Sequence, residues 1–280
     1  MKIDAHFHAW QIARGDYGWL TPALGPIYRD VKVSHWWQQA QARGVDGGVL
    51  VQAAPTAAET AFLLQQADQH RQEVLGVVGW VDLLASDAAE QVRALAAHPR
   101  LKGLRPMLQD LAQTDWILQE SVQAGLAAMA DCGLVFDALI QPRHLAVIAE
   151  LARRHPTLRL VIDHGAKPLM HASAAGQDLR QWHEGLQTLA QQAPGAMCKL
   201  SGLWTEAPAG APCQQVWPWA QALLEIWGAE RLIWGSDWPV LERAGRYDQW
   251  HDWSVDLLAP LSPAQRQAVL GGNARRMYRL

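Results

Sequence analysis

The sequence predicts one domain of the α/β class, a (β/α)8 barrel that spans residues 1–280 and ends in C-terminal helices. Three observations support this prediction. Short apolar segments alternate with helical patterns along the whole chain. These segments contain few charges, as strands buried on both faces do. No linker or run of charge divides the 280 residues, a length that suits one such barrel.

The expected elements follow from this alternation. Strands are expected at residues 3–10, 45–52, 74–81, 101–108, 134–140, 158–165, 196–203 and 231–238. Helices are expected at residues 34–43, 56–71, 86–98, 114–131, 142–155, 176–192 and 214–227, and again from about residues 262 and 273. Because chemistry in such barrels lies at the C-terminal ends of the strands, functional residues are expected there.

Boundary residues justify several of these elements. Ser34 is a suitable N-cap for the first helix, which stops at Gly44. Pro99 ends the third helix, Gly133 the fourth, and Pro142 fits the first turn of the fifth. Residues 11–33 are rich in glycine and proline, which predicts a long loop of the kind that often carries function.

Composition and charge exclude several classes of partner. A formal charge of −3 and a pI near 6.4 provide no basic surface for nucleic acid. The longest nearly apolar stretch, residues 74–85, is too short to cross a bilayer. Three scattered cysteines and a strand-like start favour a cytoplasmic protein without disulfides. The expected partner is therefore a small molecule, with the chain as a monomer or homodimer.

His6 and His8 form an HxH pattern on the first expected strand. Side chains alternate between the two faces of a strand, so Asp4, His6 and His8 are expected on one face. Two converging imidazoles suit a metal ion or a polarised carbonyl oxygen. The alternative is an edge strand with two solvated histidines.

His164 and Asp237 end two later strands. Of the 11 histidines, His6, His8 and His164 lie on expected strands. Asp237 shares a strand face with Gly235, which leaves room in the barrel mouth. A carboxylate that faces three imidazoles can accept a proton from an attacking water or complete a metal shell. The alternative for Asp237 is a helix-capping role in the loop.

Four motifs together resemble the amidohydrolase superfamily. They are residues 6–8 (HFH), 160–165 (LVIDHG), 233–239 (IWGSDWP) and 272–278 (GNARRMY). The similarity is to the sugar-lactonase branch, which contains L-fuconolactonase, L-rhamnonolactonase and a pyrone-dicarboxylate lactonase. This resemblance implies a TIM barrel of the amidohydrolase type and a hydrolase that opens a sugar-acid lactone in carbohydrate catabolism.

The chain departs from the binuclear members of that superfamily. Those members carry a bridging carboxylated lysine on strand four and a histidine on strand five, whereas the fifth strand here offers Asp137. The resemblance therefore implies either one divalent ion, with zinc as the first choice, or no obligatory metal. The ligands of such an ion would come from four residues: His6, His8, His164 and Asp237.

The implied mechanism assigns roles to the residues at the strand ends. Asp237 deprotonates a water while His164, with His6 and His8 or their ion, polarises the lactone carbonyl. Arg105 supplies a positive charge to the carbonyl or to ring hydroxyls, unless it pairs with Asp137. Further substrate-binding candidates are Lys199, Trp10, Trp80, Trp204 and Trp238, and the alternative for each tryptophan is packing under loops.

Three alternatives to a sugar lactonase stay open at this point. A metal-dependent decarboxylase of aromatic carboxylates shares this barrel and the HxH strand. A pyrone-dicarboxylate lactonase needs several converging arginines, and Arg105 is the one strong candidate. A catalytically inactive sugar-acid binder needs no carboxylate that activates water, which disfavours it.

Overall fold

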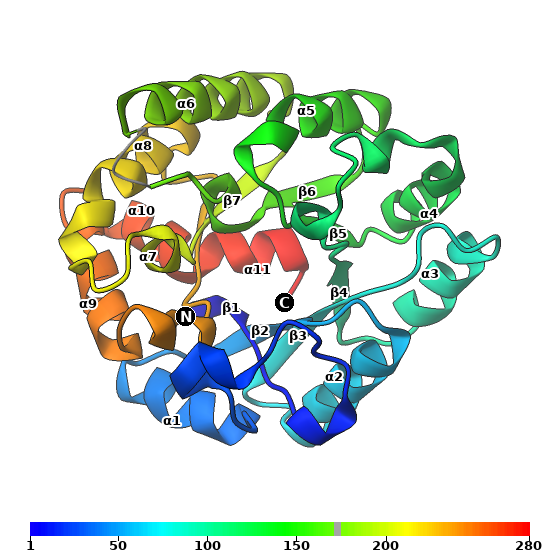
Figure 1. Ribbon diagram of the computed structural model, residues 1–280, viewed down its shortest axis with the longest axis horizontal. Helices are drawn as coiled ribbons and strands as arrows, with labels where there is room; N and C mark the ends of the chain where they lie inside the picture. Colours follow the sequence, from blue (N-terminus) through cyan, green and yellow to red (C-terminus); the bar gives the residue numbers. More distant parts are fainter. Residues whose placement is uncertain (171–174) are drawn as a thin grey trace.

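The computed structural model describes residues 1–170 and 175–280 and shows eight parallel strands inside a ring of helices (Figure 1). The strands are β1 (Ile3–Phe7), β2 (Gly47–Val51), β3 (Val74–Gly79), β4 (Leu101–Leu104), β5 (Val135–Ala138), β6 (Arg159–Ile162), β7 (Met197–Leu200) and β8 (Leu232–Trp234). They pair in sequence order. Each lies within its expected range, so the predicted (β/α)8 fold class is confirmed.

The ring closes just beyond the ends of β1 and β8. The His8 amide donates to the Trp238 carbonyl at 2.8 Å, and the Asp237 amide donates to the His6 carbonyl at 2.8 Å. These two bonds join the first and last segments of the barrel. They also fix His6, His8 and Asp237 side by side, because all three residues belong to the closing segments.

The helices cover the outside of the barrel. They are α1 (Val33–Ala42), α2 (Ala57–Gln69), α3 (Ala88–Ala96), α4 (Glu120–Asp131), α5 (Leu145–Arg154), α6 (Ala175–Gln192), α7 (Leu203–Glu206), α8 (Trp217–Trp227), α9 (Tyr247–Leu258), α10 (Pro263–Gln267) and α11 (Asn273–Tyr278). No helix of the described ranges has the length and apolar character that crossing a bilayer requires.

Three helical regions differ most clearly from the sequence-based expectation. One is the short helix α7 at Leu203–Glu206, where no helix is expected. The fourth helix starts at Glu120 rather than at residue 114, after a separate 3-10 turn at Trp116–Leu118. No helix is expected at residues 247–258, where the structure has α9. A signal for α9 is present in the sequence, because Tyr247, Trp250, Trp253 and Leu257 recur at helical spacing and are all buried.

The core has two layers. Apolar side chains from several strands, among them Ile3, Val49 and Val161, fill the barrel interior. Met277 and Tyr278 of α11 belong to the same cluster, so α11 packs against that interior layer and lies across the barrel in Figure 1. A larger apolar layer joins the strands to the surrounding helices. Polar chemistry is therefore left to the ends of the strands.

The expected alternation along β1 is wrong for Asp4. The β1–β2 register shifts between Asp4 and Phe7, which breaks the strict alternation of faces. Asp4 lies on the helix side, where it accepts hydrogen bonds from Trp36 Nε1 (2.8 Å) and the Tyr247 hydroxyl (3.1 Å). Asp4 is thus a buried structural anchor for α1 and α9, and the shift leaves His6 and His8 together.

Candidate active site

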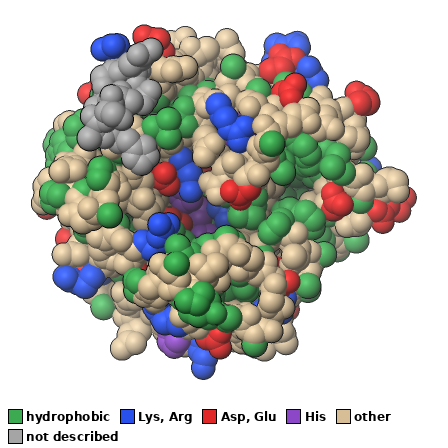
Figure 2. Space-filling model, viewed as in Figure 1, with side chains coloured by type: hydrophobic (Ala, Val, Ile, Leu, Met, Phe, Trp, Pro, Cys, Tyr) green, Lys and Arg blue, Asp and Glu red, His purple; other side chains and the backbone are tan. Residues whose placement is uncertain are grey.

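A cavity of about 240 Å³ opens beyond the C-terminal ends of the strands, and we call it the reaction cavity. Figure 2 shows the hollow at the centre of this face, with histidine and basic side chains in it. Its walls include His8, His164 and Asp237, which the sequence predicts as site residues. Three cations also line it: Arg105, Lys167 and Arg243. The location agrees with the usual position of active sites in this fold.

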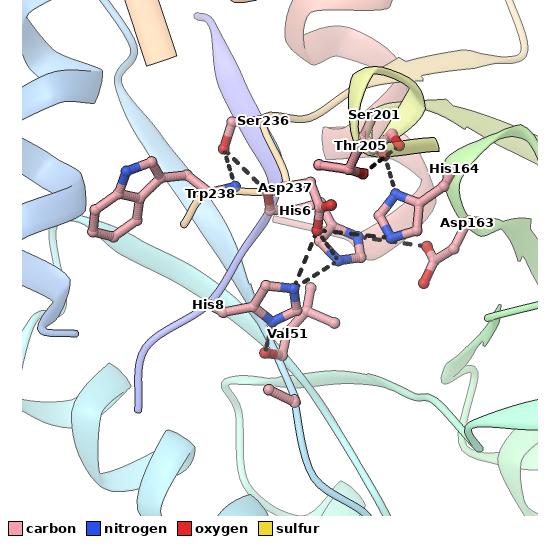
Figure 3. Close-up of polar contacts among 12 residues, drawn as sticks. His6, His8, Val51, Asp163, His164, Ser201, Thr205, Ser236, Asp237 and Trp238 are labelled. Carbon is pink, nitrogen blue, oxygen red and sulfur yellow. Dashed lines mark hydrogen bonds and ion pairs between the residues drawn. The ribbon is translucent and has the colours of Figure 1, made fainter. Parts of the chain in front are cut away.

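Asp237 lies at the centre of a histidine cluster (Figure 3). Its Oδ1 is 3.3 Å from His8 Nε2, 3.6 Å from His6 Nε2 and 3.8 Å from His164 Nε2. The Nε2 atoms of His6 and His8 are 3.2 Å apart. All four side chains are buried, and His6 has no exposed surface at all. The structure therefore brings together the four residues expected to hold a metal or activate water.

Two of these residues adopt a left-handed backbone. His164 has φ of 52° and Asp237 has φ of 59°, values that are uncommon for residues other than glycine. Gly202 makes room for the His164 ring, since a Cβ on Gly202 would lie 2.4 Å from His164 Nδ1. Such strain costs about 1–3 kcal/mol per residue and is often stored at functional sites.

Burial and mutual contact shift the pKa values of the cluster. Burial lowers the pKa of His164 to about 4 and lowers the pKa of His6 well below its usual value, so both rings are neutral near pH 7. Burial alone would raise the pKa of Asp237, but the facing imidazoles outweigh it and lower that pKa. Asp237 is consequently an ionised carboxylate near pH 7, able to accept a proton.

A second charged layer lies beneath the cluster. Lys199 Nζ donates to Asp137, lies 2.9 Å from Asp163 Oδ1, and is 3.2 Å from His6 Nδ1. The Tyr278 hydroxyl of α11 donates to Asp137 at 2.8 Å. Two buried carboxylates outweigh the effect of burial and raise the pKa of Lys199, which keeps it a cation.

Arg105 links the histidine cluster to the charged layer beneath it. Its guanidinium pairs with Asp163 at 3.2 Å and donates to the Gln52 carbonyl, so the alternative pairing with Asp137 is wrong. Asp137 is instead the partner of Lys199. Arg105 still lines the reaction cavity and can present positive charge to it.

The remaining predicted substrate contacts lie apart from the reaction cavity walls. Lys199, Trp10 and Trp238 are essentially unexposed, and Trp204 is 6% exposed. The indole nitrogens of these tryptophans donate to protein acceptors: Trp10 to the Arg29 carbonyl, Trp204 to the Ala211 carbonyl and Trp238 to the Glu242 carboxylate. In Figure 3 the Trp238 ring points away from the histidines. These contacts agree with the packing alternative.

Trp80 lines a neighbouring cavity of about 390 Å³, which we call the annex. The annex and the reaction cavity share Trp19, Met107 and Asp110 as walls. Other annex walls are apolar or acidic: Pro55, Trp80, Val81, Leu83, Pro106, Leu111, Trp116, Asp16 and Asp82. Hydrophobic side chains beside the central hollow are visible in Figure 2. The annex thus offers space for a neutral group and no described cationic wall.

Several residues of the reaction cavity were not predicted as site residues, among them Lys167, Arg243 and Trp19. Arg243 lies in a 3-10 turn, Val240–Arg243, after the last strand and belongs to none of the motifs. Trp19 lies in the long loop after β1, and only the glycine and proline content of that loop indicated a function.

The donor set can accommodate a metal ion. In the described part of the chain, two overlapping groups have ligand atoms within 4.8 Å of one another: His6, His8 and Asp237, and His6, Asp163 and His164. Imidazole nitrogens with one carboxylate are ligands that zinc prefers. The chemistry of these side chains therefore fits one divalent ion.

Comparison with known proteins gives a consistent result. Residues 3–280 match the amidohydrolase family. An L-fucono-1,5-lactonase from Burkholderia ambifaria is 43% identical over 283 residues, covering 100% of this chain and 96% of that protein. The crystal structure of an amidohydrolase from Burkholderia multivorans with bound zinc superimposes with a TM-score of 0.93 at 33% identity, covering 100% of this chain and 99% of that one.

The decarboxylases of this fold are more distant. A 5-carboxyvanillate decarboxylase from Sphingomonas paucimobilis has a TM-score of 0.66 at 16% identity, covering 100% of this chain and 99% of that one. At this level the similarity shows the fold alone.

Proposed function

Since this chain belongs to the amidohydrolase family, we propose that it hydrolyses a sugar-acid lactone of the L-fucono-1,5-lactone type to the open-chain acid. The relatives named for this activity share the whole length of the chain. The observation that carries the proposal is the Asp237 carboxylate, which faces three imidazoles at the base of the reaction cavity. That constellation suits activation of water beside a carbonyl group.

Asp237 is the proposed general base. Its ionised carboxylate takes a proton from a water, and the resulting hydroxide adds to the lactone carbonyl carbon to form a tetrahedral oxyanion. Collapse of this intermediate restores the carbonyl and breaks the bond between the acyl carbon and the ring oxygen. The ring oxygen leaves as an alkoxide and takes the proton back from Asp237, which yields the hydroxy acid.

His164 and Arg105 are the proposed stabilisers of the oxyanion. Both line the reaction cavity with Asp237. His164 is neutral near pH 7 because burial lowers its pKa to about 4, so it acts through a hydrogen bond rather than through charge. Its Nδ1 lies 2.9 Å from the Ser201 hydroxyl, which orients the ring. Arg105 supplies a fixed positive charge, held in place by Asp163.

A metal ion would occupy the same cluster. His6, His8 and Asp237 would hold it, with zinc as the first choice, in keeping with the zinc-bound relative. When bound, such an ion would polarise the carbonyl and stabilise the oxyanion as a Lewis acid.

The charges that line the reaction cavity favour a neutral lactone as substrate and its carboxylate as product. Arg105, Lys167 and Arg243 surround the place where the carboxylate product forms. Sequence reasoning identified one strong arginine, and the structure adds two further cations. Lys167 already pairs with Glu206 at 3.3 Å, and Arg105 with Asp163, so much of this charge is balanced within the protein. A dicarboxylate substrate is therefore less well matched than a polyhydroxy lactone.

A pH-indicator assay tests the proposal. The purified protein is offered a panel of aldonolactones that includes L-fucono-1,5-lactone, with and without chelator treatment, and proton release is recorded against the spontaneous rate. Catalysed acid formation is the expected result. No turnover of any lactone, together with release of carbon dioxide from an aromatic carboxylate, would replace the lactonase by a decarboxylase.

A further inference from the structure

Lys199 is completely buried, lacks contact with either cavity and is not needed for any step above. Its ammonium nonetheless lies 3.2 Å from Nδ1 of His6, on the side of the ring that faces away from the reaction cavity. An ammonium can only donate. Nδ1 of His6 must therefore present its lone pair to Lys199, and the single proton of the neutral ring must lie on Nε2.

The contact between His6 and His8 is compatible with this arrangement. His8 Nδ1 lies 2.8 Å from the Val51 carbonyl oxygen, which can only accept, so His8 carries a proton on Nδ1. His8 Nε2 lies 3.2 Å from His6 Nε2 and 3.3 Å from Asp237 Oδ1. If both histidine nitrogens presented lone pairs to each other, the two would repel. A proton on His6 Nε2 converts this contact into a hydrogen bond.

Two contacts of His6 oppose this arrangement. Asp163 Oδ1 lies 3.6 Å from His6 Nδ1 and would favour a proton on that nitrogen. Arg105 Nη1 is 3.5 Å from His6 Nε2 and would favour a lone pair at that nitrogen. That separation is longer than an ordinary hydrogen bond, and Nη1 already donates to Asp163 at 3.2 Å. Lys199 Nζ is nearer to His6 Nδ1 than Asp163 Oδ1 is, and Lys199 also holds that carboxylate at 2.9 Å, so the ammonium determines that Nδ1 presents its lone pair.

We propose that Lys199 is a positioning residue that fixes His6 with its proton on Nε2, so that this proton occupies the place where a metal ion would be held. The His6 proton points into the space between His8 Nε2 and Asp237 Oδ1, which are 3.2 and 3.6 Å from His6 Nε2. It orients the general base, and metal binding requires that it leave Nε2. Proton and metal therefore compete for one point, and Lys199 favours the proton.

Removal of Lys199 has a specific expected consequence. Asp163 Oδ1 lies 3.6 Å from His6 Nδ1 and is held by Lys199 at 2.9 Å. Without Lys199, His6 can place its proton on Nδ1 and donate it to Asp163, which frees Nε2 for a metal. A carboxylate behind a histidine ligand is the arrangement that commonly supports zinc. Loss of Lys199 is therefore expected to strengthen zinc binding.

The test compares Lys199→Met with Lys199→Gln. Both variants remove the charge with side chains of similar size, but only glutamine retains an N–H donor for His6 Nδ1. Asp137→Asn is added to both if either folds poorly, because it removes the carboxylate left without its partner. The tautomer of His6 is read from imidazole nitrogen NMR of zinc-free protein, with the signal assigned by its loss in His6→Asn. Zinc affinity is measured by competition with a chromogenic chelator.

The expected result is a His6 proton on Nε2 in the wild type and in Lys199→Gln, and on Nδ1 in Lys199→Met. Zinc should bind Lys199→Met about 10–100-fold more tightly than Lys199→Gln. A wild-type His6 with its proton on Nδ1, or equal tautomers and zinc affinities in the two variants, would overturn the inference. The role in orienting Asp237 rests on the proposed function, but neither measurement uses a lactone, so failure here leaves the lactonase proposal intact.

Discussion

The reaction cavity and the annex adjoin each other but differ in chemistry. The reaction cavity holds His8, His164 and Asp237 together with three cations, whereas the annex combines tryptophans and aliphatic side chains with carboxylates. The larger of the two spaces is the annex, at about 390 Å³ against about 240 Å³. Size therefore does not identify the chemical site in this barrel. The convergence of a carboxylate and buried imidazoles does.

Asp237→Asn should have the largest effect on the reaction cavity. Asparagine keeps the shape of the side chain and tolerates the left-handed backbone of residue 237, but it cannot take a proton from water. We expect kcat to fall by about 10²–10⁴-fold with a melting temperature close to that of the wild type. Steady-state kinetics and thermal melting measure the two quantities. A variant that retains full kcat would remove Asp237 from the mechanism.

His164→Asn tests the second member of the cluster. The variant lacks the imidazole that we propose as an oxyanion donor, and loss of such a donor typically costs about 10²–10³-fold in kcat. KM should change little, because the interaction strengthens only in the transition state. If KM rises while kcat is unchanged, His164 binds the substrate rather than stabilising the oxyanion.

The next prediction concerns Glu59, which holds the segment between the reaction cavity and the annex. Its carboxylate accepts hydrogen bonds from the Ala53 and Ala54 amides at 2.9 and 2.7 Å, and burial raises its pKa to about 7 from the usual 4.5. Ala53 lines the reaction cavity and Pro55 the annex.

Because the folded protein holds the Glu59 proton more tightly than the unfolded chain, its free energy of unfolding should fall as pH rises from about 4.5 to about 7. The size is of order a few kcal/mol, at about 1.4 kcal/mol per pKa unit. Urea unfolding across this window should show a smaller slope for Glu59→Gln, which does not titrate. Equal slopes for the two proteins would contradict the raised pKa.

Arg243→Ala should have a moderate effect, and this effect should be confined to binding of the carboxylate product. Arg243 is exposed and lines the rim of the reaction cavity, where a charge contact contributes about 0.2–1 kcal/mol. Inhibition by the product acid should weaken about 2–5-fold while kcat is retained. Inhibition constants for the acid measure this, and a loss of kcat instead would place Arg243 in the chemical step.

Trp116→Ala should have the smallest effect on a single-ring lactone. Trp116 lines the annex only, so kcat on such a substrate should stay within about 2-fold of the wild type. For a lactone with a bulky neutral substituent, KM should rise by about 2–10-fold, in line with the usual contribution of an aromatic contact. An unchanged KM for every substrate would mean that the annex does not bind substrate.

The sequence predicted the barrel and the centre of the site for physical reasons that are local. Buried parallel strands are short apolar runs, and residues at their ends converge in this fold, so His6, His8, His164 and Asp237 were found as a group. The side of the sheet on which Asp4 lies differs from the prediction because the β1–β2 register shifts between Asp4 and Phe7, and strict alternation does not account for such a shift.

The site residues that the sequence did not predict lie in loops or depend on contacts made by loops. Arg243 and Trp19 reach the cavity from segments outside the strands, where spacing does not indicate direction. The orientation of the Trp10 and Trp238 rings also depends on their hydrogen-bond acceptors. Trp10 donates to the Arg29 carbonyl, and Trp238 donates to the Glu242 carboxylate. The tautomer of His6 could not be considered until Lys199 was placed beneath it.

One measurement tests the division between the two cavities most directly. The kcat and KM of Asp237→Asn and Trp116→Ala are determined side by side on L-fucono-1,5-lactone, with spontaneous hydrolysis subtracted. We predict that Asp237→Asn loses about 10²–10⁴-fold in kcat and that Trp116→Ala keeps its kcat. Equal losses in both variants, or a loss in Trp116→Ala alone, would contradict the assignment of the chemistry to the reaction cavity.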